Sequence, residues 1–167
     1  MKNDPTTIIS FFARGREIGF VVIEGGQVVR YGVKTIKGKR QGSDSIRSVE
    51  RALWPLIETL ESQGMIVVER HSASSRTGIL CQVMGILAKR WKRAGYPTSI
   101  VSLETVKRSL CETRKAKHID ILKVMMERYP FFRPLIPQPK AAKAKYWKKV
   151  LLALALADVV KRRSDCS

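Results

Sequence analysis

The chain has 167 residues, the usual size of one domain, and 44% of them are hydrophobic, which is enough for a buried core. Its 32 Lys and Arg against 14 Asp and Glu give a formal charge of +18, so a polyanionic partner is expected, either nucleic acid or an acidic membrane surface. We expect no membrane span, because the most apolar stretch, Val150 to Val160, is shorter than the ~18 residues that cross a bilayer.

The first residues, MKNDPTTII, lack the basic flank and small-residue cleavage site of a secretory signal. The cysteines Cys81, Cys111 and Cys166 are odd in number and form no CxxC pair, which favours a reducing compartment and argues against a zinc site. With the positive charge, these features predict a cytoplasmic, nucleoid-associated protein.

The N-terminal third reads as three strands. Thr6 to Ala13, Ile18 to Ile23 and Gln27 to Ile36 are rich in β-branched and aromatic residues, and Gly25-Gly26 supplies a turn. These runs predict an antiparallel three-stranded meander.

Helices and strands alternate in the rest of the chain. A short apolar run, Met65 to Val68, is typical of a strand buried on both faces, and it ends at Glu69 and Arg70. In the helix predicted from Thr77 to Ala94, the residues expected to point inward are Ile79, Leu80, Val83, Met84, Ile86, Leu87 and Trp91. The other predicted elements are a helix from Ser43 or Asp44 to Leu60, a strand from Ser99 to Ser102, and helices starting near Leu103, from His118 to Arg128 and from Ala141 to Lys161.

This order predicts an α/β fold with a mixed five-stranded sheet, flanked by helices, in a single domain spanning residues 1–167.

Positive charge is concentrated toward the C-terminus, because no acidic residue occurs from Arg128 to Ala157. Such clustering predicts phosphate contacts that weaken with salt. Tyr146 and Trp147 lie among these lysines, and two roles stay open for them: stacking on unpaired bases or packing in the core. The residues predicted to contact nucleic acid are Arg70, Lys107, Arg108, Arg114, Lys115, Lys117, Lys143, Lys145, Lys148 and Lys149.

Several local motifs resemble those of the RuvC Holliday-junction resolvases, a family in the RNase H-like superfamily. The motifs are IISFFARGREIGFVVI, MIVVE, ETVKRSL, RKAKHID and LLALALADVV. The resemblance implies an RNase H-like fold, branched DNA as partner, DNA contacts by Lys107 and Lys117, and a homodimer that uses the apolar helix from Thr77.

The family holds two Mg²⁺ or Mn²⁺ ions with carboxylates from three places in the chain. Aligned with it, this sequence has Phe12 at the first place, Glu69 at the second, and Lys148, Lys149 and Leu152 at the third. Phe cannot ligate a metal and lysine repels one, so the resemblance implies DNA binding with impaired or absent nuclease activity and no cofactor. Glu69 is then expected to be structural, paired with Arg70 or a lysine.

Two alternatives remain open from the sequence. One is an active endonuclease that holds Mg²⁺ or Mn²⁺ with Glu69 and Asp158, helped by Glu17 or Glu24. The other is an RNA-binding or assembly factor on the same fold.

Overall fold

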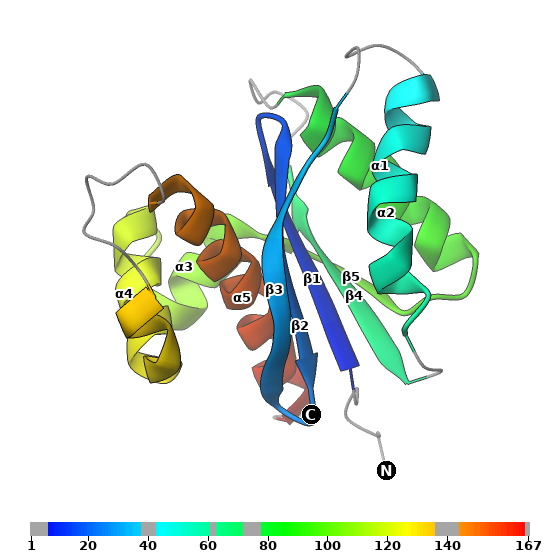
Figure 1. Cartoon of the computed structure of the whole chain (residues 1–167). Helices are drawn as coiled ribbons and strands as arrows, with labels where there is room; N and C mark the ends of the chain where they lie inside the picture. Colours follow the sequence, from blue (N-terminus) through cyan, green and yellow to red (C-terminus); the bar gives the residue numbers. More distant parts are fainter. Residues whose placement is uncertain (1–6, 38–42, 61–62, 72–77, 136–143, 166–167) are drawn as a thin grey trace.

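The structure is a computed structural model and describes residues 7–37, 43–60, 63–71, 78–135 and 144–165. A twisted mixed sheet of five strands, in the order β3-β2-β1-β4-β5, is covered by helices on both faces (Figure 1). The predicted α/β fold class is therefore confirmed.

The meander predicted for the N-terminal third is also confirmed, with strand ends that differ from the predicted ones by at most one residue. β1 (Thr7–Arg14) pairs antiparallel with β2 (Glu17–Glu24), and β2 pairs antiparallel with β3 (Gln27–Thr35). On its other side β1 pairs in parallel with β4 (Gly64–Arg70), which pairs in parallel with β5 (Thr98–Ser102). The carboxyl ends of β1, β4 and β5 thus lie at one edge of the sheet.

The helices cover both faces of the sheet, in one layer on one face and in two layers on the other (Figure 1). The predicted element order holds, with one short 3₁₀ helix added. The helices are α1 (Ser43–Ile57), α2 (Ile79–Arg93), α3 (Leu103–Cys111), α4 (His118–Arg128), η1 (Pro130–Leu135) and α5 (Ala144–Asp165).

Side-chain alternation along the strands gives two cores. Ile9 and Phe11 of β1 face the layer of α1 and α2, whereas Ile8 and Phe12 face α5. Every residue of α5 from 150 to 160 is buried, because α5 packs between the sheet and the layer of α3 and α4. The apolar stretch noted in the sequence is therefore a core helix.

α5 approaches β2 at Gly19. A Cβ on Gly19 would lie only 2.5 Å from the backbone oxygen of Lys149, so this contact requires glycine. Farther along the helix, Lys161 lies beside Gly26, in the turn after β2. α5 therefore runs in the direction of β2 and opposite to β1.

α2 buries most of the side that was predicted to face inward: Leu80, Val83, Met84, Leu87 and Trp91 are buried. Ile79 and Ile86 were also expected to point inward, and this was wrong, because they are 42% and 43% exposed. Apolar residues occur on more than one side of this helix, so spacing alone assigned these two isoleucines to the wrong side.

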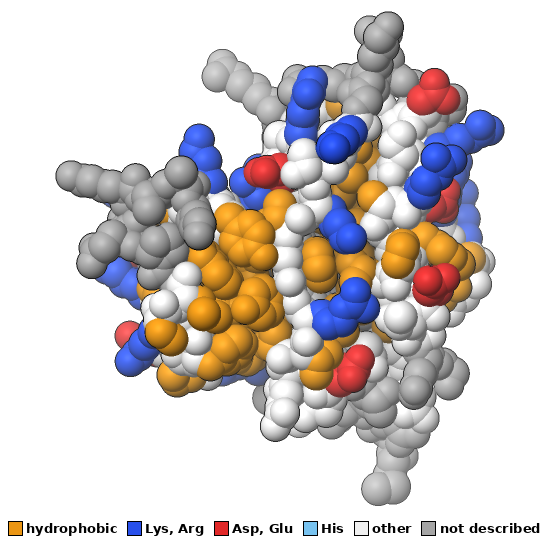
Figure 2. All heavy atoms as spheres, viewed as in Figure 1, with side chains coloured by type: hydrophobic (Ala, Val, Ile, Leu, Met, Phe, Trp, Pro, Cys, Tyr) orange, Lys and Arg blue, Asp and Glu red, His pale blue; other side chains and the backbone are white. Residues whose placement is uncertain are grey.

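A second group of exposed apolar side chains lies on the other side of the molecule. Phe131 of η1 is 46% exposed and Tyr146 of α5 is 37% exposed. Figure 2 shows hydrophobic side chains gathered in this region, beside β3. Within the part of the chain that is described, no helix combines the length and apolar character needed to cross a membrane.

Candidate functional site

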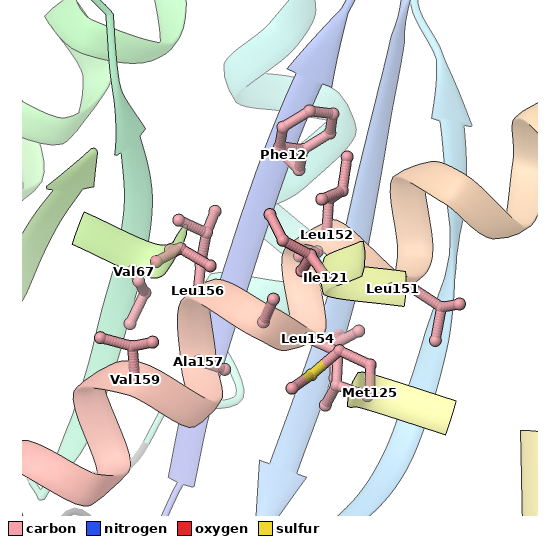
Figure 3. Packing of buried hydrophobic residues seen from close by; sticks show 14 of the residues in the cluster. Phe12, Val67, Ile121, Met125, Leu151, Leu152, Leu154, Leu156, Ala157 and Val159 are labelled. Atoms are coloured by element: carbon pink, nitrogen blue, oxygen red, sulfur yellow. The ribbon is translucent and has the colours of Figure 1, made fainter. Parts of the chain in front are cut away.

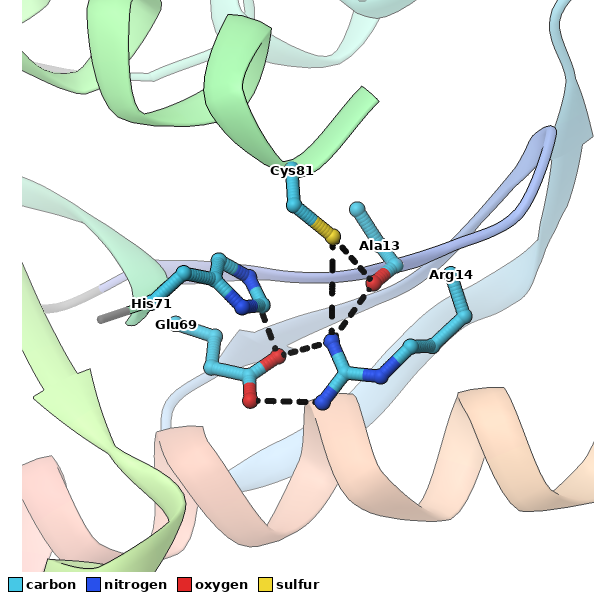
Figure 4. Close-up of polar contacts among 5 residues, drawn as sticks. All are labelled: Ala13, Arg14, Glu69, His71 and Cys81. Carbon is cyan, nitrogen blue, oxygen red and sulfur yellow. Dashed lines mark hydrogen bonds and ion pairs between the residues drawn. The ribbon is translucent and has the colours of Figure 1, made fainter. Parts of the chain in front are cut away.

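Glu69 lies near the end of β4 and is only 4% exposed. Both of its oxygens are held by Arg14, the last residue of β1: Nη1 lies 2.7 Å from Oε2 and Nη2 lies 2.8 Å from Oε1 (Figure 4). Parallel pairing of Phe11 with Val68 brings these two strand ends together. The predicted partner, Arg70 or a lysine, was wrong: Arg70 is exposed, because successive strand residues point to opposite faces.

Two more groups complete what we call the strand-end site, defined as Arg14, Glu69, His71 and Cys81. His71 Nε2 lies 3.3 Å from Glu69 Oε2, and the Cys81 thiol donates to the backbone oxygen of Ala13 at 3.2 Å (Figure 4). Arg14 Nη1 also donates to that oxygen, at 2.7 Å. The glutamate is therefore fixed by contacts within the chain.

Burial sets the acid–base behaviour of the strand-end site. It raises the pKa of the Glu69 carboxyl, while the bidentate ion pair with Arg14 opposes this shift. Burial, reinforced by the Arg14 charge, lowers the pKa of His71 to about 4, so the imidazole is neutral at pH 7. Burial also raises the pKa of the Cys81 thiol, which makes it a poor nucleophile.

Apolar side chains occupy two of the places where the resemblance implies metal-binding carboxylates. Phe12 is 1% exposed and pairs with Gly19, the residue against which Lys149 packs. Leu152, one turn farther along α5, is fully buried and lies next to Phe12 (Figure 3). Arg14 covers the Phe12 ring, with its Cζ 4.3 Å from the ring centroid.

The third implied place also carries Lys149, whose side chain is 12% exposed. Its Nζ lies 2.7 Å from Glu17 Oε2, so this lysine and this glutamate neutralise each other. Glu24 is exposed at the other end of β2, where it pairs with Thr7 at the start of β1. Glu17 is thus near the strand-end site but engaged, and Glu24 is distant from it.

Asp158 belongs to a separate cluster. It is 6% exposed and accepts hydrogen bonds from Arg128 Nη1 and from the Tyr129 hydroxyl at 2.9 Å, and Arg162 Nε lies 3.1 Å away. Nine residues separate it from Lys149, about 13 Å along a helix that runs away from the strand-end site. The structure does not bring Asp158 and Glu69 together.

These contacts test whether the residues fit the two Mg²⁺ or Mn²⁺ ions of the resembled family. Hard cations need several oxygen ligands, but this region offers Phe12, Leu152 and a carboxylate already bound by Arg14. Among the described residues, no three His, Cys, Asp or Glu side chains lie together as a metal-binding group. The residues do not fit a two-metal site, and we derive no chemical step through one.

Cations surround the start of α4 instead. Burial lowers the pKa of His118, and the nearby charges of Lys148, Lys107 and Arg14 lower it further. These three cations come from α5, α3 and β1, three elements that are far apart in the sequence. Of these three, Arg14 is already paired with Glu69, which leaves Lys107 and Lys148 as positive charges near His118.

The other residues predicted to contact nucleic acid differ in their surroundings. Arg108 and Arg114 both pair with Glu104, at 3.3 and 3.2 Å, and this glutamate therefore neutralises part of their charge. The backbone N–H of Lys117 donates to Asp120 at 2.7 Å, which caps α4 and leaves the lysine side chain exposed. Arg70, Lys115, Lys145 and Lys148 are exposed, and Lys143 lies outside the described residues.

The sequence did not identify Arg14 and His71 as parts of this site. Arg14 follows Ala13 at the strand end, and its pairing with a residue 55 positions away depends on the register of β1 against β4. The sequence did contain one signal for the ion pair: Arg14 ends one strand and Glu69 lies near the end of another. It becomes specific only once the two strands are known to be neighbours.

No protein-family model and no curated protein matches the sequence. Among solved structures, the chain is similar to RuvC of Thermus thermophilus, with a TM-score of 0.63 and 13% identity over 92% of each chain. It is similar as well to T. thermophilus RuvC in complex with a Holliday junction substrate, with a TM-score of 0.61 and 14% identity over 92% of this chain and 91% of that one. The chain has the RuvC fold. At this identity the similarity establishes the fold alone.

Proposed function

We propose that this protein binds branched DNA, with a four-way junction as the preferred form, and does not cut it. One observation carries the proposal: on a RuvC fold, Phe12 and Leu152 fill the expected metal region and Arg14 binds the remaining carboxylate, Glu69. A chain built in this way keeps a surface for the nucleic acid but lacks the ligands for metal-assisted hydrolysis.

The charge supports nucleic acid as the partner. The chain carries +18, and Lys107 and Lys148 lie at the carboxyl end of the parallel strands, next to α4. In the solved complex, RuvC of the same fold is bound to a Holliday junction substrate. Phosphate contacts by lysine position DNA without reading its sequence, so we expect selection by shape.

We further propose a homodimer formed through α2. Ile79 and Ile86 are exposed on this helix, and two isoleucines of one helix can pack against the same pair of a second copy. A two-fold pair would present two equivalent basic surfaces to a symmetric junction. Size-exclusion chromatography with light scattering at micromolar concentration tests this, and Ile79→Lys/Ile86→Lys is expected to give a monomer.

The decisive experiment measures binding and cleavage together. The pure protein is incubated with labelled four-way junction, linear duplex and structured RNA, at two salt concentrations, with and without Mg²⁺ or Mn²⁺. We expect binding that prefers the junction, falls with salt and does not require metal, and we expect no cleavage products.

Two other outcomes have distinct meanings. Metal-dependent paired nicks that Glu69→Gln abolishes would show an active nuclease and overturn the proposal. Tighter binding to structured RNA than to the junction at matched salt would favour the RNA-binding or assembly factor. Asp158→Asn serves as a control in the cleavage assay, because Asp158 lies in a separate ion-pair cluster.

A further inference from the structure

Five aromatic rings meet where β3, η1 and the start of α5 come together. We call this cluster the aromatic surface, defined as Tyr31, Phe131, Phe132, Tyr146 and Trp147. Ring centroids lie 4.1 Å apart for Phe131 and Phe132, 5.9 Å for Phe132 and Trp147, and 5.1 Å for Trp147 and Tyr146. Tyr31 joins them at 5.1 Å from Phe132 and 5.6 Å from Trp147. Four of the five separations fall in the range typical of aromatic contact and the fifth, 4.1 Å, is shorter, so the cluster is continuous.

The two ends of the aromatic surface are exposed and its centre is buried. Phe132 is fully buried and Trp147 is partly buried, whereas Phe131 and Tyr146 are 46% and 37% exposed. The buried rings hold the exposed ones in place, so little side-chain freedom is lost when a ligand packs on them. Figure 2 shows the hydrophobic side chains of this region on the surface beside β3. Two exposed rings held by buried ones form a candidate binding surface.

The charged residues next to these rings in the sequence are all positive. Lys145 and Lys148 flank the two α5 rings and are exposed, and Arg133 follows the two η1 rings. Arg133 Nε donates to the backbone oxygen of Met126 at 3.2 Å, which holds its guanidinium beside η1. The sequence supplies no Asp or Glu from residue 128 to residue 157. The surface therefore combines flat apolar rings with exposed lysine and arginine side chains.

We propose that the aromatic surface binds unpaired nucleotides, with bases stacked on Tyr146 and Phe131 and phosphates held by Lys145, Lys148 and Arg133. Unpaired bases are required because in a duplex both faces of each base are covered by its neighbours, whereas a single strand offers an open face to a protein ring. Protein interfaces are depleted of lysine at their centres, so the density of lysine here favours a polyanion over a protein partner.

This inference rests on the proposed nucleic-acid function and extends it. A junction or fork that carries a single-stranded segment would contact the cations near α4 with its phosphates and the aromatic surface with its bases. Lys148 is shared by both regions, since it flanks Trp147 and acts on His118. The protein would thus prefer branched DNA with unpaired nucleotides over fully paired DNA of the same length.

The test separates stacking from charge. Fluorescein-labelled oligothymidylate of 20 nucleotides is compared with an abasic strand of the same length, which has the same phosphates and no bases. We expect the protein to bind oligothymidylate about tenfold more tightly than the abasic strand. The double variant Tyr146→Leu/Phe131→Leu keeps the apolar volume but removes the flat rings, and it is expected to lose this preference while binding linear duplex within twofold of the wild type.

Trp54→Leu is the matched control, because Trp54 is a 42%-exposed aromatic residue on α1, on the opposite side of the sheet. It should retain the full preference for bases. Thermal unfolding of each variant verifies that it is folded, and the single variant Tyr146→Leu replaces the double variant if the latter is unfolded.

Equal binding of the oligothymidylate and the abasic strand by the wild type overturns the inference, and so does an unchanged preference in the folded variant. Either result, with binding to the four-way junction intact, leaves the proposed function standing and favours a protein as the ligand of this surface. Absence of binding to every nucleic acid would overturn both proposals.

Discussion

The strand-end site and the aromatic surface both contain cations, but they use them differently. In and beside the strand-end site, Arg14 is bound to Glu69 and Lys149 to Glu17, so the chain neutralises its own charge. At the aromatic surface, Lys145 and Lys148 are exposed in a stretch that has no acidic residue. The placement of the few carboxylates, more than the number of cations, decides which cations are neutralised within the chain, and therefore where we expect a polyanion to bind.

Removing the cation of the strand-end site should have the largest effect. Arg14→Ala leaves the buried Glu69 carboxylate without its partner, which is expected to lower the free energy of unfolding by about 3 kcal/mol. Urea denaturation followed by circular dichroism measures this. Arg16→Ala, a change at an exposed arginine two residues away, is the control and should stay within about 0.5 kcal/mol of the wild type. A similar small loss for Arg14→Ala would show that the ion pair contributes little.

The second largest loss of stability is expected from a substitution at Gly19, against which Lys149 packs. Gly19→Ala places a Cβ 2.5 Å from the Lys149 backbone oxygen, so α5 must move away from β2, and we expect a loss of about 2 kcal/mol. Gly85→Ala in α2 meets no atom within 4 Å and should stabilise the protein by about 0.5–1 kcal/mol, because alanine favours helix. Thermal unfolding of both variants measures the difference. Equal effects of the two substitutions would contradict the close packing of α5.

The salt dependence of DNA binding should show which lysines contact phosphates and which are already paired within the protein. Lys107→Ala and Lys117→Ala should each weaken junction binding across sequences and reduce the slope of log K against log salt by about one. Lys149→Gln is expected to leave the slope unchanged, because its Nζ is already paired with Glu17. Fluorescence anisotropy titrations at four salt concentrations measure the slopes. If the slope changed for Lys149→Gln and not for the other two variants, Lys149 would be the residue that contacts phosphate, and Lys107 and Lys117 would not be.

The stability of the strand-end site is also expected to depend on pH. The pKa of His71 is about 4 in the folded protein against an ordinary 6.5, so between these values the unfolded chain takes up a proton that the folded one does not. Stability should therefore fall as the pH is lowered from about 6.5 toward 4. His71→Gln should flatten this part of the profile, as measured by urea midpoints at several pH values. A profile as steep as that of the wild type would place the titration elsewhere.

Part of the strand-end site was predictable and part was not. The continuous apolar run MIVV identified a strand buried on both faces, and so placed Glu69 at its end. The sequence also showed that a phenylalanine, Phe12, lies in the predicted first strand where the resembled family has a carboxylate. The partner of Glu69 did not follow, because Arg70 is adjacent in sequence but points away, whereas Arg14 is 55 residues distant and lies across the β1–β4 pair.

The sequence by itself determined the class of fold, the order of its elements, the concentration of positive charge and the absence of acids at positions 12, 148, 149 and 152. These features follow from local periodicity and composition, which a single segment carries in its own residues. Only the tertiary structure decided which cations are neutralised, that Ile79 and Ile86 are exposed, and that rings from β3, η1 and α5 form one surface. Such contacts depend on strand register and helix rotation, which are set by the packing of segments that are distant in the chain.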